Sequence, residues 1–277
     1  MAPNQKVLRI ATILNIDDCI LHCTRLWSMN DKKTDAFDVY STTTGLRQIS
    51  NPVRQKILSE LQRRDLSLSE IAQLTGKAQS TLSVHLDKMV KEGLIGYRDD
   101  PDDNRRKIFY LVSRPVGSSV VPREDLMRQV ELTIAKSIGT PSTFLKGVIR
   151  SIVIGMEAIG FNMDPVLKDI GRQIGREISK RMKSNNIEGI IGEIKEFFKQ
   201  HELGEVNVYA LHPVTLIIKD EYDCSKAPDV GKTLCLMNEG IIEAIFETRM
   251  GLPARVTKAE TFGTAYNFCK YVIEPGL

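Results

Sequence analysis

The sequence predicts an α+β protein that begins with a winged helix-turn-helix domain and ends with a second, α+β domain. Residues 46–93 hold three helical patterns, the last two joined by a short turn that contains a glycine. A β-hairpin pattern with a polar tip and a basic returning strand follows over residues 94–112. Beyond residue 141 helical patterns come before strand patterns, and 277 residues are enough for two domains.

The three N-terminal helices are expected at residues 46–61, 68–74 and 78–92. Their expected start and stop signals are Asn51-Pro52 in the first, Ser67 or Ser69 and Gly76 in the second, and Gly93 after the third. Two short helices joined by a turn, the second polar at its start, are typical of proteins that read the DNA major groove. The hairpin would then be the wing, so the sequence predicts binding to double-stranded DNA.

Charge and composition limit where such binding can occur. The net charge is only +3, so a DNA-binding surface must be local. Residues 46–114 contain 13 Lys and Arg against 9 Asp and Glu, and four of these acids crowd the expected wing tip at Asp99, Asp100, Asp102 and Asp103. No apolar run approaches the ~20 residues that span a bilayer, and residues 1–6 do not resemble a signal peptide. We therefore expect no membrane partner, a cytoplasmic location and reduced thiols.

The domain boundaries are expected where composition changes. Residues 1–40 are expected to be an N-terminal extension that could serve dimerisation, and residues 41–114 the winged helix-turn-helix domain. A stretch rich in Pro, Gly and Ser at residues 113–122 marks the boundary, and a linker helix at 124–138 lies within residues 115–140. In the final domain, residues 141–277, we expect helices at 142–159, 165–183, 187–201 and 231–246, and strands at 206–209, 214–219, 254–260 and 266–272.

Four segments of the N-terminal domain resemble the ArsR-type winged helix-turn-helix repressors: residues 49–58, 68–72, 80–86 and 92–95. The resemblance implies that the helix carrying Ser83 and His85 lies in the major groove and that the wing touches the minor groove or the backbone. The implied contacts to base edges or phosphates come from Gln79, Ser80, Thr81 and Ser83, with His85 as a packing, phosphate-contacting or sensing residue. The implied phosphate contacts come from Lys77, Lys88, Arg98, Arg105, Arg106 and Lys107. The alternative is a winged helix that contacts protein.

Metal-sensing ArsR members carry a Cys-x-Cys motif in the helix before the recognition helix. The matching stretch here, residues 66–70, contains no cysteine. Sensing is therefore expected elsewhere in the chain.

Three of the five cysteines, Cys224, Cys235 and Cys269, lie in the last 54 residues. Together with the glycines of residues 155–175 and with Gly240, they make residues 142–273 resemble the 4-vinyl reductase domain, an α+β fold that binds small molecules. Such domains occur in chlorophyll-pathway proteins, in phenol-responsive activators and, fused to ArsR-type helices, in regulators of methanogenic archaea, some of which are redox-responsive. The domain order of this chain resembles that archaeal group.

The resemblance also bears on what the cysteines do. Zinc-binding members of the 4-vinyl reductase family use three cysteines and a carboxylate; Cys235 and Cys269 match two of these positions, whereas Thr261 and Lys258 replace the others. Cys224 or Glu260 could substitute as zinc ligands. Alternatively, the three cysteines form a reversible disulfide and sense redox state, or they are small buried apolar residues.

Two further groups of residues have a structural and a functional interpretation. Cys19, His22 and Cys23 share a helix face and could bind a metal or sense redox state, although Ile16, Ile20, Leu26 and Trp27 favour an apolar seam. Met156, Ile159, Phe161, Met163, Phe197 and Phe198 could line a pocket for a small apolar or tetrapyrrole-like ligand, or could be core.

The sequence therefore predicts a regulator and not an enzyme. It lacks Gly-x-Gly-x-x-Gly, a complete phosphate-binding loop at Gly231 and His-Glu-x-x-His. We expect a homodimer whose operator affinity changes with the redox state of its thiols, transmitted through the linker helix at 124–138. The alternatives are a small-molecule effector and, less favoured, a protein-interaction adaptor.

Overall fold

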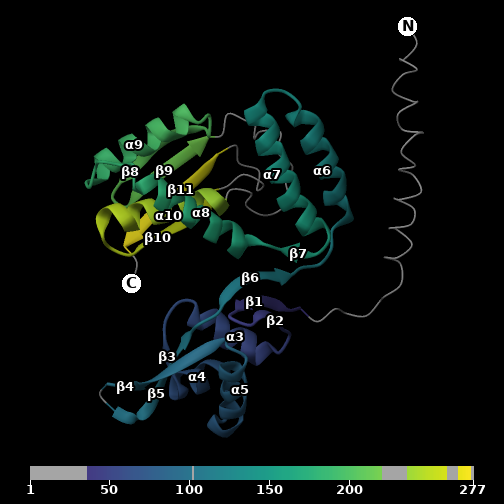
Figure 1. The fold of residues 1–277 in the computed structure, drawn as a ribbon, viewed down its shortest axis with the longest axis vertical. Helices are drawn as coiled ribbons and strands as arrows, with labels where there is room; N and C mark the ends of the chain where they lie inside the picture. Colours follow the sequence, from purple (N-terminus) through teal and green to yellow (C-terminus); the bar gives the residue numbers. More distant parts are fainter. Residues whose placement is uncertain (1–35, 102, 220–235, 261–267, 276–277) are drawn as a thin grey trace, which may run out of the picture. The chain divides into compact units, whose positions relative to one another are not determined.

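The computed structural model describes residues 36–101, 103–219, 236–260 and 268–275 (Figure 1). Residues 1–35 of the predicted N-terminal extension, with the Cys19, His22 and Cys23 cluster, lie outside these ranges, as do Cys224 and Cys235. The predictions made for those residues remain predictions.

The first helix of the DNA-binding domain, α3, spans Pro52–Leu61. The Asn51 side chain caps it by accepting hydrogen bonds from the amides of Val53 and Arg54, both at 3.1 Å. The predicted start at residue 46 is wrong, because a residue before proline avoids helical geometry and proline itself favours the first helical turn. The preceding residues instead form strand β2, Gly45–Ile49, which pairs with β1, Asp38–Thr42.

The next two helices confirm the predicted helix-turn-helix. Helix α4 spans Leu68–Thr75, and α5 spans Gln79–Lys91. Ser67 caps α4 in a reciprocal capping box with Glu70, as the Ser-x-x-Glu spacing indicates. The left-handed backbone of Gly76, with φ of 65°, ends α4, and that of Gly93, with φ of 70°, follows the end of α5.

The wing is a three-stranded antiparallel sheet in the order β3-β5-β4. Its strands are β3, Leu66–Ser67, β4, Ile95–Asp100, and β5, Asp103–Leu111. Side chains from the sheet and from all three helices form one apolar core, whose fully buried members include Ile57, Leu58, Leu66, Ile71, Leu82, Leu86, Met89 and Leu94. This core fixes the orientation of α5.

A second sheet, in the order β2-β1-β6-β7, was not expected. Strand β6, Arg114–Ser119, runs through the stretch that the sequence indicated to be irregular, and β7 is Phe161–Asn162. Strand β6 forms because β1 offers it an antiparallel edge. At the end of β6, the Ser119 amide donates to the carbonyl oxygen of Phe37 at 2.8 Å, and the Phe37 amide donates to the Ser119 hydroxyl at 2.7 Å. Pro, Gly and Ser have low strand propensity, so the partner strand decides the conformation.

The C-terminal domain is α+β, as predicted. Its helices are α6, Glu124–Ser137, α7, Pro141–Ala158, α8, Asp164–Ser179, α9, Ile187–Gln200, and α10, Leu236–Met250. Its sheet has the order β10-β11-β9-β8, with β8 at Glu205–Leu211, β9 at Val214–Lys219, β10 at Ala254–Glu260 and β11 at Cys269–Pro275. Predicted and observed elements correspond, but α8 ends four residues before the expected Lys183 and α10 extends four residues beyond the expected Phe246.

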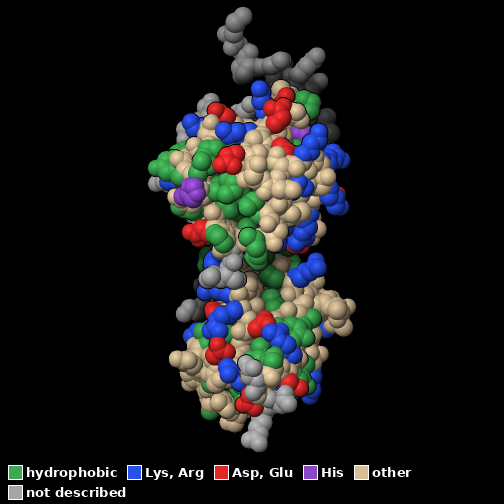
Figure 2. All heavy atoms as spheres, turned by 90° about the vertical axis from the view of Figure 1, so that its left-hand side faces the viewer, with side chains coloured by type: hydrophobic (Ala, Val, Ile, Leu, Met, Phe, Trp, Pro, Cys, Tyr) green, Lys and Arg blue, Asp and Glu red, His purple; other side chains and the backbone are tan. Residues whose placement is uncertain are grey.

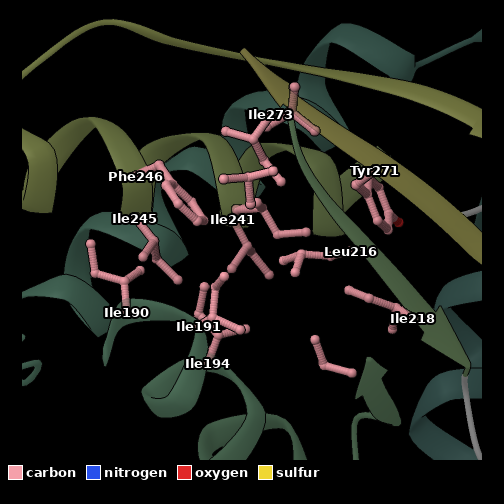
Figure 3. Packing of buried hydrophobic residues seen from close by; sticks show 14 of the residues in the cluster. Ile190, Ile191, Ile194, Leu216, Ile218, Ile241, Ile245, Phe246, Tyr271 and Ile273 are labelled. Atoms are coloured by element: carbon pink, nitrogen blue, oxygen red, sulfur yellow. The ribbon is translucent and has the colours of Figure 1, made fainter. Parts of the chain in front are cut away.

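The core of this domain lies between the sheet and helices α9 and α10 (Figure 3). Ile190, Ile191 and Ile194 of α9 meet Ile241, Ile245 and Phe246 of α10, and the strands add Leu216, Ile218, Tyr271 and Ile273. The apolar periodicity of α9, with buried residues at spacings of three and four, accounts for its position over this core.

Helix α8 packs against α10 along a seam of glycines. A Cβ atom at Gly171 would lie 2.1 Å from the carbonyl oxygen of Met237, and one at Gly240 would lie 2.1 Å from that of Lys168. Beside the seam, Lys168 bonds to Glu239 at 2.6 Å and to Glu243 at 2.9 Å, and Arg172 pairs with Glu243 and Glu247. Glycine is required here because the two backbones are too close for any side chain.

Among the described residues, no helix combines the length and the apolar character that a membrane span requires.

Candidate nucleic-acid interface

Helix α5 is anchored on one side and open on the other. Leu82, Leu86 and Met89 point into the apolar core and are at most 2% exposed. The opposite side, at spacings of four, presents Ser80, Val84 and Lys88, all exposed. A helix that is held by its apolar side and leaves its other side free is the element that winged helix-turn-helix proteins insert into the major groove.

The start of α5 is suited to a phosphate. The residue at its N-cap, Ala78, supplies no side-chain acceptor, so the first amides of the helix are available to a ligand. Lys77, Gln79 and Ser80 surround this end and are exposed. Lys77 forms no ion pair with any residue that the structure describes. The helix dipole and this lysine both favour an anion at the N-terminus of α5.

The other predicted residues of α5 differ in their surroundings. The Ser83 hydroxyl donates to the carbonyl oxygen of Gln79 at 2.9 Å, and the His85 side chain is half-buried on the flank of the helix. Thr81 lies on the open side, and Lys88 is 3.9 Å from Glu92.

Val84 was missed in the sequence reasoning, although it is 70% exposed at the centre of the open side of α5. An exposed valine offers apolar contact to a thymine methyl group. Its position is readable from the sequence, because it lies two residues after Leu82 and two before Leu86, opposite the buried side. The α5 residues expected to contact DNA were all polar, so Val84 was not among them.

Two basic residues of the wing are held against aromatic rings. Arg98 forms a 2.8 Å ion pair with Asp65 and lies 5.7 Å from the centre of the Tyr110 ring. The Lys107 Nζ lies 4.1 Å from the centre of the Tyr97 ring. Both cations remain exposed, so the rings orient them without removing them from solvent.

Arg106 has a structural role that the sequence did not indicate. Its guanidinium donates to the Ser67 hydroxyl at 3.1 Å and lies 3.5 Å from Asp100 and 3.8 Å from Glu70. The contacts join strand β5 to the N-terminus of α4, so Arg106 fastens the wing to the helix-turn-helix. The side chain of Arg105, the other predicted phosphate contact here, lies outside the described part of the structure.

Surface charge on the DNA-binding domain is mixed where Figure 2 shows it, with Lys and Arg interspersed among Asp and Glu. This agrees with the small net charge of the chain.

In the C-terminal domain, only one of the predicted sensor cysteines is described. Cys269 begins β11, pairs with Ile218 of β9 and is 1% exposed within the apolar core. Among the described residues, no group of three His, Cys, Asp or Glu side chains could hold a metal ion. The predicted zinc ligands Cys224 and Cys235 and the side chain of Glu260 lie outside this description, so the zinc site stays a prediction.

The six residues that could form either a ligand pocket or core lie in different surroundings. Phe198 is fully buried in the main core, Met163 packs in a separate cluster, and Ile159 is 48% exposed. Residues of α8 and α9 and of the segments that follow them line a groove of about 670 Å³. Its apolar members include Ile174, Ile178, Met182 and Phe197, and its polar members include Glu177, Arg181, Glu196 and His201. Hydrophobic side chains gather on this face of the domain in Figure 2.

Comparison with known protein families identifies the first domain. The family of bacterial regulatory proteins named arsR matches residues 51–97, from the cap of α3 to the second strand of the wing sheet. The chain carries an ArsR-family helix-turn-helix domain. A domain of this family makes the chain a DNA-binding transcription regulator, which confirms the predicted resemblance for this part of the chain.

Two relatives of the chain come from Methanocaldococcus jannaschii, and both are uncharacterized proteins. One is 24% identical over 129 residues, which are 46% of this chain and 73% of the relative. The other is 27% identical over 99 residues, 36% of this chain and 59% of the relative.

Three solved structures are similar to the chain. A vinyl-4-reductase family protein from M. jannaschii has a TM-score of 0.35 and 16% identity, over 55% of this chain and 92% of that one. The phenol-responsive sensory domain of the transcription activator PoxR, solved with phenol, has a TM-score of 0.34 and 12% identity, over 70% and 90%. An H-NOX protein from S. oneidensis has a TM-score of 0.35 and 12% identity, over 54% and 89%.

Proposed function

We propose that the chain binds a specific operator as a homodimer, reading it with α5 and the wing, and that its C-terminal domain changes this affinity in response to a chemical signal. The observation that carries the proposal is the open side of α5, with Ser80, Val84 and Lys88 exposed opposite a fully buried apolar side. The ArsR-family match over residues 51–97 supports it.

The residues of α5 divide into two functional groups. Gln79 can pair with adenine through two hydrogen bonds, Ser80 and Thr81 hydrogen-bond to base edges, and Val84 contacts a thymine methyl group. Lys77 and the N-terminal amides of α5 bind a phosphate and fix the register of the helix in the groove. On the wing, Arg98 and Lys107 bind the DNA backbone, and Arg106 holds the wing in place.

The division between reading and positioning residues can be tested by binding titrations. Lys77→Ala should weaken binding to every sequence about equally and lower the slope of log affinity against log salt by about 1. Gln79→Ala should weaken binding to the operator alone, with a loss of about 1–3 kcal/mol in discrimination. Lys183→Ala, which removes an exposed lysine of the C-terminal domain, is the matched control and should leave both quantities unchanged.

For the signal, we propose thiol oxidation. Two cysteine thiols join as a disulfide and give up two protons and two electrons, which reduce an oxidant such as hydrogen peroxide to water. Cys269 is shielded in the core, so Cys224 or Cys235 is the thiol expected to react first. A small apolar ligand is the second candidate signal, and the groove between α8 and α9 supports it.

The two signals differ in their dependence on cysteine. If thiols carry the signal, mild oxidation changes operator affinity in the wild-type chain, and Cys224→Ser or Cys235→Ser removes the change. Cys269→Ser is a less informative variant because it places a hydroxyl in an apolar core. Operator binding that is identical in reduced and oxidised protein would contradict thiol sensing and leave the ligand as the proposal.

A further inference from the structure

Helices α6 and α7 form a hairpin that is packed on its inner sides. Leu126 and Val130 of α6 meet Ile154 and Ala158 of α7 in a small apolar cluster. Near the hairpin turn the helices approach so closely that a Cβ atom at Gly147 would lie 2.2 Å from the side chain of Ser137. These contacts use one side of each helix and define the hairpin as a unit (Figure 1).

The opposite side of α7 carries an apolar stripe that faces solvent. Leu145, Ile149, Ile152, Met156 and Ile159 follow one another at intervals of four, three, four and three residues. Leu145 is 61% exposed and Ile152 is 53% exposed, and only Met156 is half-buried. This heptad spacing is the one by which helices pair side by side through their apolar residues.

The charged residues of α7 lie on another side of the helix. Lys146, Arg150 and Glu157, at intervals of four and seven, share that side. The Lys146 ammonium donates to the carbonyl oxygen of Glu202, and Arg150 is buried. The stripe itself therefore contains no charge.

Helix α6 enlarges the exposed apolar surface. The open patch consists of eight large apolar side chains, from 39% to 75% exposed: Met127, Ile134, Ile138, Phe144, Leu145, Ile149, Ile152 and Ile159. Glu131, which is exposed four residues after Met127 and three before Ile134, interrupts the α6 part of this patch, so its continuous part is the stripe of α7. Proteins that act as monomers rarely leave such a stripe in water.

We propose that this patch pairs with the same patch of a second copy of the chain, so that two α6–α7 hairpins form a four-helix interface. The inference rests on the proposed function, because a dimer that reads two half-sites needs a self-complementary surface. The connection to the DNA-binding part also favours the α6–α7 hairpin as the interface. Helix α6 begins five residues after β6, and β6 pairs with β1 of the DNA-binding part. A stripe without charges and with heptad spacing is complementary to itself.

The test is the mass of the full-length chain in solution, measured by light scattering without DNA. The wild-type chain should have twice its 31.1 kDa monomer mass. The double variant Ile149→Glu/Ile152→Glu and its counterpart Ile149→Lys/Ile152→Lys should each be monomeric, because like charges face each other. Mixing the two variants should restore the dimer, because the charges are then opposite.

Restoration of the dimer on mixing shows that the variants are folded, since misfolded variants would not recombine. Leu252→Glu, which alters a residue that is 62% exposed beyond α10, is the matched control and should remain dimeric. A monomeric wild-type chain, or double variants that keep the dimer mass, would overturn the interface. Because the measurement contains no DNA, a dimer that behaves as expected supports the interface even if operator binding fails.

Discussion

Glu70 joins the helix-turn-helix to the wing through several contacts. Its carboxylate accepts the Ser67 amide at 2.8 Å and the Arg64 guanidinium at 2.6 Å, and it lies 3.8 Å from Arg106. The hydrogen bond from the Ser67 backbone, followed by that from Arg64, lowers the pKa of Glu70 from 4.5 to about 2. The charged form of this side chain therefore stabilises the native domain.

This pKa shift predicts how stability depends on pH. Because the folded-state pKa is the lower one, the contribution is complete above pH 4.5 and is lost as the pH falls towards about 2. Glu70→Gln should cost about 1 kcal/mol at pH 7, as expected for a helix N-terminal cap, and less at pH 3. Chemical unfolding of the full chain at both pH values measures the difference. Glu177→Gln, which alters an exposed surface pair, should have little effect at either; a Glu70→Gln cost that does not shrink at pH 3 would contradict the account.

For single residues, the sequence indicated hydrogen-bond partners that are close along the chain and not those that are distant. The Ser67–Glu70 capping box is readable because its members are three residues apart. The contact of Arg106 with Ser67 is not readable, because 39 residues separate them and the pairing depends on the register of β3 with β5. Arg106 therefore has a structural role that was not predicted, and its predicted phosphate contact stays a prediction.

Among the elements, the α8–α10 pair shows how glycine sets the distance between helices. Cβ atoms at Gly171 and Gly175 would lie 2.1 and 2.4 Å from the carbonyl oxygens of Met237 and Ile241. These oxygens belong to backbone, which cannot move aside as a side chain would. Alanine at either position must therefore push α8 and α10 apart. This separation would lengthen the ion pairs that Lys168 and Arg172 of α8 form with α10.

Glycine variants test this packing. Gly171→Ala should destabilise the C-terminal domain by about 1–3 kcal/mol, the usual cost of overpacking, and lower the thermal unfolding temperature of the full chain. Gly192→Ala in α9 is the matched control, because no atom lies within 4 Å of a Cβ there. That control should be neutral or stabilising by up to about 1 kcal/mol, since alanine is the better helix former. Equal melting temperatures for the two variants would contradict the close approach of α8 and α10.

Helices were more predictable than strands because their signals are local. Caps and apolar periodicity placed α4, α5 and α9 within two residues. Strands β1, β2 and β6 were missed, since residues such as Pro115 and Gly117 favour a strand only when a partner edge is present. The apolar residues Leu46 and Ile49 of β2 were assigned to a helix for the same reason.

For the whole molecule, the order of elements along the chain was predictable and their arrangement in sheets was not. The sequence indicated both domains and the α+β class, but the strand order β10-β11-β9-β8 depends on contacts that local patterns do not contain. The choice between pocket and core for single side chains also depends on such contacts: Phe197 and Phe198 are neighbours in sequence, yet one lines the groove and the other is buried in the core.

The central claim is that α5 reads a specific DNA sequence. Fluorescence anisotropy of the full-length chain, titrated against a duplex from upstream of its own gene and a scrambled duplex of equal length, tests it most directly. We expect tighter binding to the first duplex, affinity that falls steeply with salt for both duplexes, and loss of the preference in a Ser80→Ala/Val84→Ala variant. The claim would be contradicted if no duplex from the upstream region bound more tightly than its scrambled counterpart. It would also be contradicted if the Ser80→Ala/Val84→Ala variant kept the preference.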